Sequence, residues 1–182
     1  HLLSLVNDVL NLAKIEAGET TLSLETIELT GLVVEALHLV EEIAATAGVS
    51  MVNCLHGESC GLVRVDLTRT KQILLNLLTN AIKFTHPQGK VQVEVLEREQ
   101  TIEIAVSDTG IGIEPKAIPK LFRIDEKYQR LGTAREKGTG LGLILCKELI
   151  EMHGGKLWVE SELNQGATFR FTLPKALNKP EN

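Results

Sequence analysis

Two asparagines and a lysine recur at spacings that a helix would bring onto one face. Asn76, Asn80 and Lys83 follow one another at steps of four and three residues, which makes them neighbours on a helix surface. A solvated polar face is one interpretation, but such faces favour Glu, Lys and Arg, and Asn is a poor helix former. Amide oxygens suit Mg²⁺, which keeps waters and substrate phosphates as further ligands. We therefore predict that the asparagines act as ligands and that Lys83 meets a phosphate as a point charge.

A second candidate site lies where a predicted strand runs into a glycine-rich turn. Three apolar residues alternate along that strand: Ile102, Ile104 and Val106. Asp108 is next on the same strand face, so its carboxylate is predicted to point with the buried side chains. One interpretation is a plain Asp-Gly turn. The other is a buried acceptor for an exocyclic amino group such as that of adenine, with Gly110 and Gly112 letting the backbone approach a flat ring.

The third candidate is the run Gly138-Thr139-Gly140-Leu141-Gly142, directly before a predicted helix. Glycines at a helix start expose backbone N–H groups where the helix dipole is positive, which suits a phosphate. The run does not follow a strand, so it is not the dinucleotide fingerprint of a Rossmann unit. It also lacks the Gly-Lys-Ser/Thr of a Walker-type loop. Spaced glycines alone are weak evidence, but the three motifs in this order, with a long unpatterned loop at 123–139, are more specific.

The elements that must position these motifs are intermingled helices and strands. Helices are predicted at 1–17, 31–47, 68–84 and 140–153, with a short one near 115–122. Strands are predicted at 22–29, 50–55, 62–66, 90–97, 101–107, 156–161 and 167–173. We expect a two-layer α/β sandwich, in which a mixed sheet has helices packed on one face.

Apolar periodicity predicts which face each helix buries. The first helix carries Leu2, Leu5, Val9 and Leu12 at coiled-coil spacing, ends at Gly18, and needs a partner helix. Thr30 is predicted to cap the second helix, whose buried face would comprise Leu32, Ala36, Leu39, Ile43 and Ala47. The third helix would turn six residues toward the sheet: Ile73, Leu74, Leu77, Leu78, Ala81 and Ile82.

Composition narrows the class of protein. Of 182 residues, 43% are hydrophobic and 3% aromatic, so aliphatic side chains must fill a sizeable core. The net charge of -5 argues against nucleic acid as a partner, and no Lys/Arg cluster suggests a membrane surface. The 3 cysteines describe no disulfide framework, which favours the reducing cytoplasm. No apolar run could span a membrane. Because the chain opens on His1, we expect a fragment of a longer protein, in which an upstream anchor stays open.

Taken together, the motifs resemble those of sensor histidine kinases of two-component systems, whose catalytic domain has the Bergerat ATP-binding fold shared with gyrase, Hsp90 and MutL. Six segments carry the resemblance: Asn76 to Phe84 (N box), Asp108 to Gly112 and Gly138 to Gly142 (glycine boxes), Lys120-Leu-Phe122 (start of the F box), Gly166-Ala-Thr168-Phe169 (closing strand), and Leu5 to Gly18 (end of the dimerisation and phosphoacceptor hairpin).

The resemblance implies a division of the chain and a set of residue roles. Residues 1–18 would end the hairpin, 19–176 would form the catalytic domain, and 177–182 would be a tail. Asn80 would bind Mg²⁺, Asn76 would support that site, Lys83 would contact phosphate, Phe84 would pack near the base, and Asp108 would bind the adenine amino group with Thr168 nearby. Residues from about 115 to 139 would form a lid with Lys127 or Arg123 as its basic residue, closing on Gly138, Thr139, Gly140, Leu141 and Gly142.

The function implied is presentation of Mg·ATP for phosphoryl transfer to a histidine on the upstream hairpin, of the same or a partner subunit, and onward to an aspartate of a response regulator. The phosphoacceptor motif is absent, and all five histidines read as ordinary surface residues. They are His1, His38, His56, His86 and His153. We therefore predict that this chain binds ATP without phosphorylating itself.

Two other functions stay open at this stage. An ATPase of the same fold would carry a glutamate base one helical turn before the metal-binding Asn80, where this chain has Asn76, a poor base. A degenerate interaction scaffold is suggested by the irregular lid. There Phe122 is followed by Arg-Ile-Asp-Glu-Lys-Tyr128, and Ile124 or Tyr128 would replace the usual second aromatic.

Overall fold

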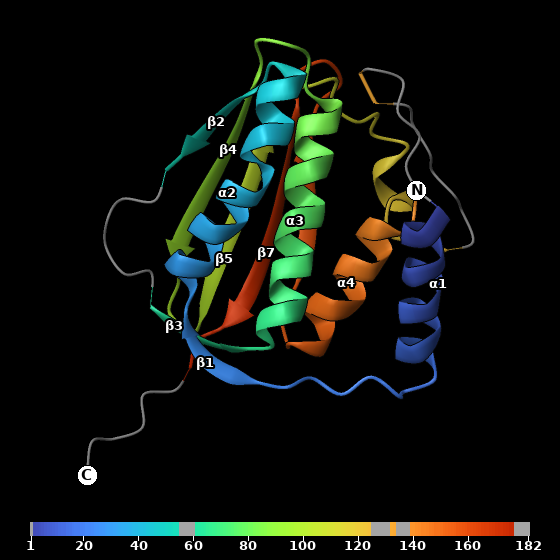
Figure 1. The fold of residues 1–182 in the computed structure, drawn as a ribbon, viewed down its shortest axis with the longest axis vertical. Coiled ribbons are helices and arrows are strands. Elements are labelled where there is room, and N and C mark those ends of the chain that lie inside the picture. The colour runs from blue at the N-terminus through green and yellow to red at the C-terminus, as the bar shows by residue number, and fades with distance from the viewer. Residues whose placement is uncertain (1, 55–60, 125–131, 134–138, 177–182) are drawn as a thin grey trace.

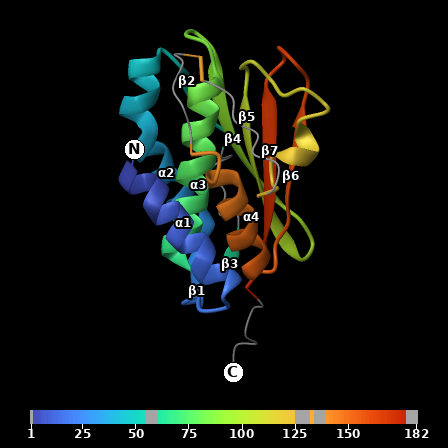
Figure 2. The same ribbon diagram turned by 90° about the vertical axis from the view of Figure 1, so that its right-hand side faces the viewer.

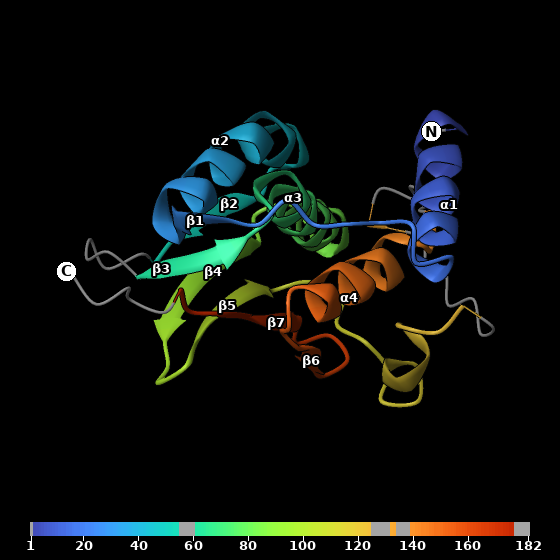
Figure 3. The same ribbon diagram turned by 90° about the horizontal axis from the view of Figure 1, so that it is seen from below.

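The computed structural model describes residues 2–54, 61–124, 132–133 and 139–176, with the backbone alone for residues 2–5. In chain order the elements are α1 (Leu2–Glu16), β1 (Glu25–Glu28), α2 (Leu29–Ala47), β2 (Ser50–Asn53), β3 (Leu62–Val65), α3 (Leu67–Phe84), β4 (Lys90–Glu97), β5 (Thr101–Asp108), the 3₁₀ turn η1 (Ile118–Lys120), α4 (Gly142–Met152), β6 (Leu157–Ser161) and β7 (Ala167–Pro174). Figure 1 looks onto the helical layer, and Figure 3 shows α2, α3 and α4 on one side of the strands. The predicted two-layer α/β sandwich is confirmed.

The main sheet is mixed and carries the site at one end of its central strands. Its order is β2-β4-β5-β7-β6, with β2 parallel to β4 and the other neighbours antiparallel. Strands β5 and β7 pair from Thr101 opposite Pro174 to Asp108 opposite Ala167. Strands β1 and β3 form a separate antiparallel pair. The register therefore leaves Asp108 at the end of a strand with neighbours on both sides.

Helix α3 is central in the helical layer (Figure 2) and buries the predicted face. Its six predicted sheet-facing residues are all buried: Ile73, Leu74, Leu77, Leu78, Ala81 and Ile82. The strand residues predicted to face it, Ile102, Ile104 and Val106, have no exposed surface. Asp66 caps the helix by accepting a hydrogen bond from the Arg69 N–H at 3.0 Å. The asparagines of α3 lie on a different side of the helix from these six residues and line a pocket instead.

The predicted buried face of helix α2 is confirmed at Leu32 and Ala36 and is wrong at Leu39 and Ile43. Leu39 and Ile43, predicted to be core, are 54% and 49% exposed. The buried residues are Leu29, Leu32, Val33, Ala36, Leu37, Val40 and Ala44. The helix also begins earlier than predicted, because Glu28 rather than Thr30 caps it by accepting from the N–H groups of Thr30 and Gly31. Apolar residues occupy more than one side of this helix, so its sequence pattern allowed more than one buried face. Packing against the rest of the domain selects the face with Leu37, Val40 and Ala44 over the face with Leu39 and Ile43.

Helix α1 packs beside α4 rather than being solvated all round (Figure 3). Leu12 is 6% exposed, whereas Val9, predicted on the same seam, is 49% exposed. Leu12 and Ile15 belong to or pack against the main core. Of the predicted seam, Leu12 therefore contacts the domain while Val9 remains exposed, together with Val6 and Leu10, which were not predicted to belong to it. The Leu2 and Leu5 side chains lie outside the described residues.

One histidine prediction is wrong. His153 is buried, with 6% of its surface exposed. Its Nε2 accepts a hydrogen bond from the Asp66 N–H at 3.0 Å, and its Nδ1 lies 2.6 Å from the Leu149 carbonyl oxygen. Through these two contacts the ring ties the end of α4 to the start of α3. His38 and His86 are exposed as predicted, and His1 and His56 lie outside the described residues.

Two further predictions concern the segment after β5 and the end of the chain. The helix predicted near 115–122 is a single 3₁₀ turn, Ile118–Lys120, with Pro119 in its first turn. The loop predicted at 123–139 falls largely outside the described residues, as does the tail at 177–182. In the part of the chain that the structure describes, no helix combines the length and apolar character needed to cross a membrane.

Candidate nucleotide site

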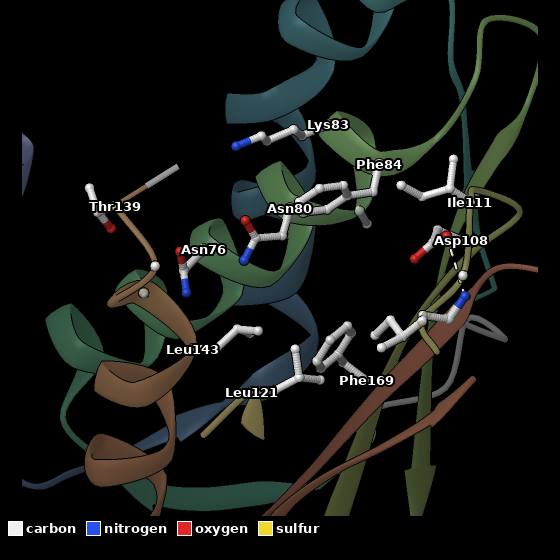
Figure 4. A pocket seen from close by; sticks show the side chains of 16 residues that line it. Asn76, Asn80, Lys83, Phe84, Asp108, Ile111, Leu121, Thr139, Leu143 and Phe169 are labelled. Atoms are coloured by element: carbon white, nitrogen blue, oxygen red, sulfur yellow. Dashed lines mark hydrogen bonds between the residues drawn. The ribbon is translucent and has the colours of Figure 1, made fainter. Parts of the chain in front are cut away.

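One pocket gathers the motifs of the sequence (Figure 4). It lies between the second half of α3, the end of β5 and the start of α4. Its lining comprises Asn76, Asn80, Ala81, Lys83, Phe84, Asp108, Ile111, Gly112, Ile113, Leu121, Thr139, Gly140, Gly142, Leu143, Ala167 and Phe169. The structure thus joins segments that are far apart in the sequence.

The α3 wall of the pocket is polar. Asn76, Asn80 and Lys83 project from successive turns of the helix on one side of the pocket, as the spacing predicted (Figure 4). The Lys83 Nζ lies 5.3 Å from the centroid of the Phe84 ring, a cation–π distance. The Lys83 carbonyl oxygen accepts hydrogen bonds from the Thr133 N–H at 3.0 Å and its hydroxyl at 3.1 Å. Thr133 thereby ties the segment between η1 and α4 to the end of α3.

Asp108 forms the opposite end of the pocket. Its Oδ1 accepts hydrogen bonds from the Gly110 N–H at 2.8 Å and the Ala167 N–H at 3.3 Å. Burial raises the pKa of this carboxyl to about 6, and the two backbone hydrogen bonds oppose that shift only in part. Within the described residues no donor reaches Oδ2, and the carboxylate faces the pocket (Figure 4). A strand-end carboxylate with one oxygen held and one available is suited to accept from a ligand amino group.

The two glycines after Asp108 serve the protein's own backbone. A Cβ on Gly110 would lie 2.0 Å from the Phe84 carbonyl oxygen, and the Ile111 N–H donates to that oxygen at 3.0 Å. Gly112 has a φ of +61°, and a Cβ there would lie 2.0 Å from the Glu162 carbonyl oxygen. Gly112 lines the pocket and Gly110 does not. At Gly110 the backbone therefore approaches the end of α3 closely, rather than a flat ligand ring as predicted.

The second glycine motif leads into α4 as predicted. Gly140 has a φ of +74°, and the Thr139 hydroxyl accepts from the Leu141 N–H at 3.2 Å. The same hydroxyl donates to the Asp8 carboxylate of α1 at 3.1 Å. Thr139, Gly140 and Gly142 line the pocket, whereas Leu141 packs against the core. Gly138 and Lys127 lie outside the described residues.

Thr168 lies on the wrong side of the sheet for its predicted role. Side chains alternate along β7, and Ala167, not Thr168, pairs with Asp108. The Thr168 hydroxyl donates to the Ser107 hydroxyl at 2.9 Å on the face away from the helices. Thr168 is not among the pocket residues. The neighbouring residues Ala167 and Phe169 line the pocket in its place.

Sequence reasoning missed most of the apolar lining. Ile111, Ile113, Leu143, Ala167 and Phe169 line the pocket and carried no predicted role. Their signal is three-dimensional: Phe169 reaches the site because β7 pairs with β5, a register that no local pattern reveals. Near the predicted F box, Leu121 lines the pocket and Phe122 packs against the core. Ile124 is 47% exposed, and Tyr128 lies outside the described residues.

A family model described as "Histidine kinase-, DNA gyrase B-, and HSP90-like ATPase" matches residues 65–177, which include every described residue of the pocket. This chain belongs to that family. Its relatives include proteins named as histidine kinases. The circadian input-output histidine kinase CikA of Synechococcus elongatus is 40% identical over 179 residues, which cover 96% of this chain and 23% of CikA. The histidine protein kinase DivJ of Caulobacter vibrioides is 40% identical over 181 residues, which cover 97% of this chain and 29% of DivJ.

Solved structures agree with the sequence relatives. Full-length ShkA in complex with AMPPNP superposes with a TM-score of 0.82 at 34% identity, covering 97% of this chain and 36% of ShkA. The histidine kinase ThkA in complex with the response regulator TrrA gives a TM-score of 0.72 at 26% identity, covering 95% of this chain and 48% of ThkA. The chain is thus a histidine kinase catalytic ATP-binding domain, and it spans less than a third of the length of CikA or DivJ.

Proposed function

We propose that this catalytic domain binds Mg·ATP in the pocket between α3, β5 and α4, and that the whole protein is a protein-histidine kinase. One observation carries the proposal. The pocket has an acceptor carboxylate at one end, Asp108, and amide and ammonium groups along its other wall, on Asn76, Asn80 and Lys83 (Figure 4). The apolar residues between them, including Phe169 and Leu143, suit the flat face of a base.

The base end favours adenine. An exocyclic amino group donating to Asp108 Oδ2 would complete the hydrogen bonding of a carboxylate whose Oδ1 is already held by Gly110 and Ala167. A carbonyl at the same place, as in guanine, would meet an acceptor with an acceptor. Because buried groups left unpaired are costly, this contact discriminates between the two bases.

The other end suits phosphates and a magnesium ion. The described residues contain no group of three or more His, Cys, Asp or Glu that could hold a metal by themselves. Mg²⁺ fits a site with few protein ligands, since it keeps waters and substrate phosphates. The amide oxygen of Asn80 would hold it there, with Asn76 alongside, and the ion would supply neutralisation of phosphate charge. Lys83 would add a positive charge on the same wall, and the glycine motif would contribute N–H groups.

The partners follow from the exposed side of α1. Val6, Val9 and Leu10 form an apolar face that the catalytic domain leaves uncovered. We infer that other helices of a dimerisation hairpin cover this face and carry the histidine that receives the γ-phosphate, in the same or the partner subunit. ThkA is recorded in complex with a response regulator, which supports onward transfer to such a receiver domain. We also infer a cytoplasmic location, without membrane or nucleic-acid contact by this segment.

Calorimetric titration tests the proposal. A non-hydrolysable ATP analogue is titrated into the chain with and without Mg²⁺, and again into Asp108→Asn. We expect saturable binding that weakens without Mg²⁺ and drops roughly 10- to 100-fold in the variant, the worth of a hydrogen bond to a charged group. Absence of binding by a folded sample would contradict the proposal and support an interaction scaffold instead.

A further inference from the structure

The side-chain amide of Asn76 is held between two residues of α4. Its Nδ2 donates a hydrogen bond to the Cys146 Sγ at 3.0 Å. Its Oδ1 lies 2.4 Å from the position that a Cβ on Gly142 would occupy. Asn76 lines the pocket, while Cys146 lies one helical turn below Gly142 and is 2% exposed. The amide therefore spans the boundary between the core and the nucleotide pocket.

The orientation of the Asn76 side chain matters because the two ends of an amide differ chemically. An asparagine side chain has a donor end and an acceptor end of nearly equal shape, so it can turn over unless its partners select one orientation. A phosphate-bound cation requires the oxygen to face the pocket. A partner in the core that accepts from the NH₂ group selects that orientation, and an apolar partner of similar size does not.

Cys146 has the properties of such a partner. Its side chain is buried, with 2% of its surface exposed, and its sulfur accepts the hydrogen bond from the Asn76 NH₂ group. Its own proton points toward the Ile73 carbonyl oxygen of α3, with Sγ 3.9 Å from that oxygen. The thiol thus donates to one group of α3 and accepts from another, and no metal, disulfide or nucleophilic role is needed to account for it.

We propose that Cys146 is a positioning residue for the nucleotide site: it turns the Asn76 amide so that its oxygen serves the magnesium and phosphate end, and Gly142 leaves the space that this oxygen occupies. The inference rests on the proposed function of the pocket. It assigns to the small residue at 142 a role beyond helix initiation, since Gly142 has no positive φ that would require a glycine.

A pair of substitutions of equal size separates positioning from packing. Cys146→Ser and Cys146→Ala leave nearly the same volume, but only serine keeps an acceptor for the Asn76 NH₂ group. We expect Cys146→Ala to weaken binding of the Mg²⁺-bound ATP analogue about three- to tenfold, the effect of one neutral hydrogen bond. Cys146→Ser should stay within about twofold of the unmodified chain by the same reasoning. Ile150→Val, a buried α4 substitution away from Asn76, controls for loosening of the helix.

A double-mutant cycle distinguishes positioning of the Asn76 amide from a purely structural role of Cys146. In an Asn76→Ala background, Cys146→Ala should have no further effect on the affinity for the Mg²⁺-bound analogue, because it acts only through the amide. Binding of the analogue without Mg²⁺ should change much less than binding with it. Gly142→Ala, which intrudes on Oδ1 with Cys146 intact, should reproduce the Mg²⁺-specific loss if Cys146→Ala fails to fold.

Three results would overturn the inference while leaving the proposed function intact. They are equal losses in the alanine and serine variants, additive losses in the cycle, and an unchanged ratio of affinities with and without Mg²⁺ in Gly142→Ala. If the unmodified chain itself does not bind the analogue, the proposed function fails instead. Thermal melts of every variant identify those that do not fold, and the comparison is then made among the variants that do.

Discussion

At the scale of single residues, the carboxyl group of Asp108 is predicted to link nucleotide binding to pH. Burial raises its pKa from 3.8 to about 6, and the proposed hydrogen bond from the adenine amino group would need the ionised form as acceptor. Affinity for the ATP analogue should therefore fall as the pH drops through about 6, by about tenfold between pH 8 and pH 5 for one group with this pKa. Titrations across this range measure the effect. Asp108→Asn, which binds weakly throughout, is the control, and an equal slope in the variant would contradict the assignment.

The same carboxyl group should lower the stability of the nucleotide-free domain at neutral pH. Because its folded pKa lies above its unfolded value, the folded state binds more protons between about pH 4 and pH 6, and stability falls as the pH rises through that window. Asp108→Asn removes the charge and keeps an oxygen that can accept from Gly110 and Ala167. We expect it to raise the free energy of unfolding at pH 7 by about 1–3 kcal/mol, and to lose this advantage near pH 4. Urea melts at both pH values test this expectation.

Gly110 tests whether the close approach of two backbones shapes the pocket. A methyl group there would meet the Phe84 carbonyl oxygen at 2.0 Å and break its hydrogen bond with the Ile111 N–H. We expect Gly110→Ala to destabilise the domain by about 1–3 kcal/mol, as overpacking does, and to weaken nucleotide binding. Gly18→Ala is the matched control, since Gly18 has a positive φ but open space around it. A smaller loss of stability for Gly110→Ala than for Gly18→Ala would contradict the interpretation.

At the scale of elements, α1 should dock on the domain through one face only. Leu12 is 6% exposed and Val9 is 49% exposed. Replacing Leu12 with serine removes buried apolar surface, so we expect faster hydrogen exchange in α1 while the amides of α3 keep their protection. Val9→Ser changes the exposed face of the same helix and should leave exchange in α1 nearly unaltered. Equal effects of the two variants would mean that α1 does not pack on the domain through the Leu12 face.

Comparison of β4 and α3 with α2 shows how much of the fold could be predicted from the sequence. Strand β4 was predicted at 90–97, where the structure has Lys90–Glu97, and α3 buries all six predicted residues, because each has a single dominant period. The buried face of α2 was predicted correctly at Leu32 and Ala36 but wrongly at Leu39 and Ile43, because apolar residues lie on several sides of that helix and its neighbours decide between them. Thr168 and Phe169 show the same limit in a strand: which of the two lines the pocket depends on the pairing of β7 with β5.

The candidate site was predictable where its chemistry is local. Residue type and spacing alone indicated four of its residues, and the structure brings them to one pocket: Asn76, Asn80, Lys83 and Asp108. Cys146 could not be found in this way. A buried cysteine on an apolar helix face is indistinguishable by pattern from core packing, and its contact with Asn76 exists only once α4 lies against α3.

At the scale of the whole molecule, ATP binding and transfer of its phosphate are predicted to need different parts of the protein. None of the five histidines lies in a phosphoacceptor motif, and Asn76, one turn before Asn80, is an amide and so a poor base for water. We therefore expect the chain incubated with Mg·ATP to accumulate no acid-labile phosphate and to show no fast multiple-turnover hydrolysis. A histidine kinase hairpin joined ahead of residue 1 should supply an acceptor and give phosphohistidine, which Asp108→Asn in the same fusion should greatly reduce. Steady labelling of the chain alone would place an acceptor within these 182 residues, and rapid release of phosphate would favour an ATPase of the same fold.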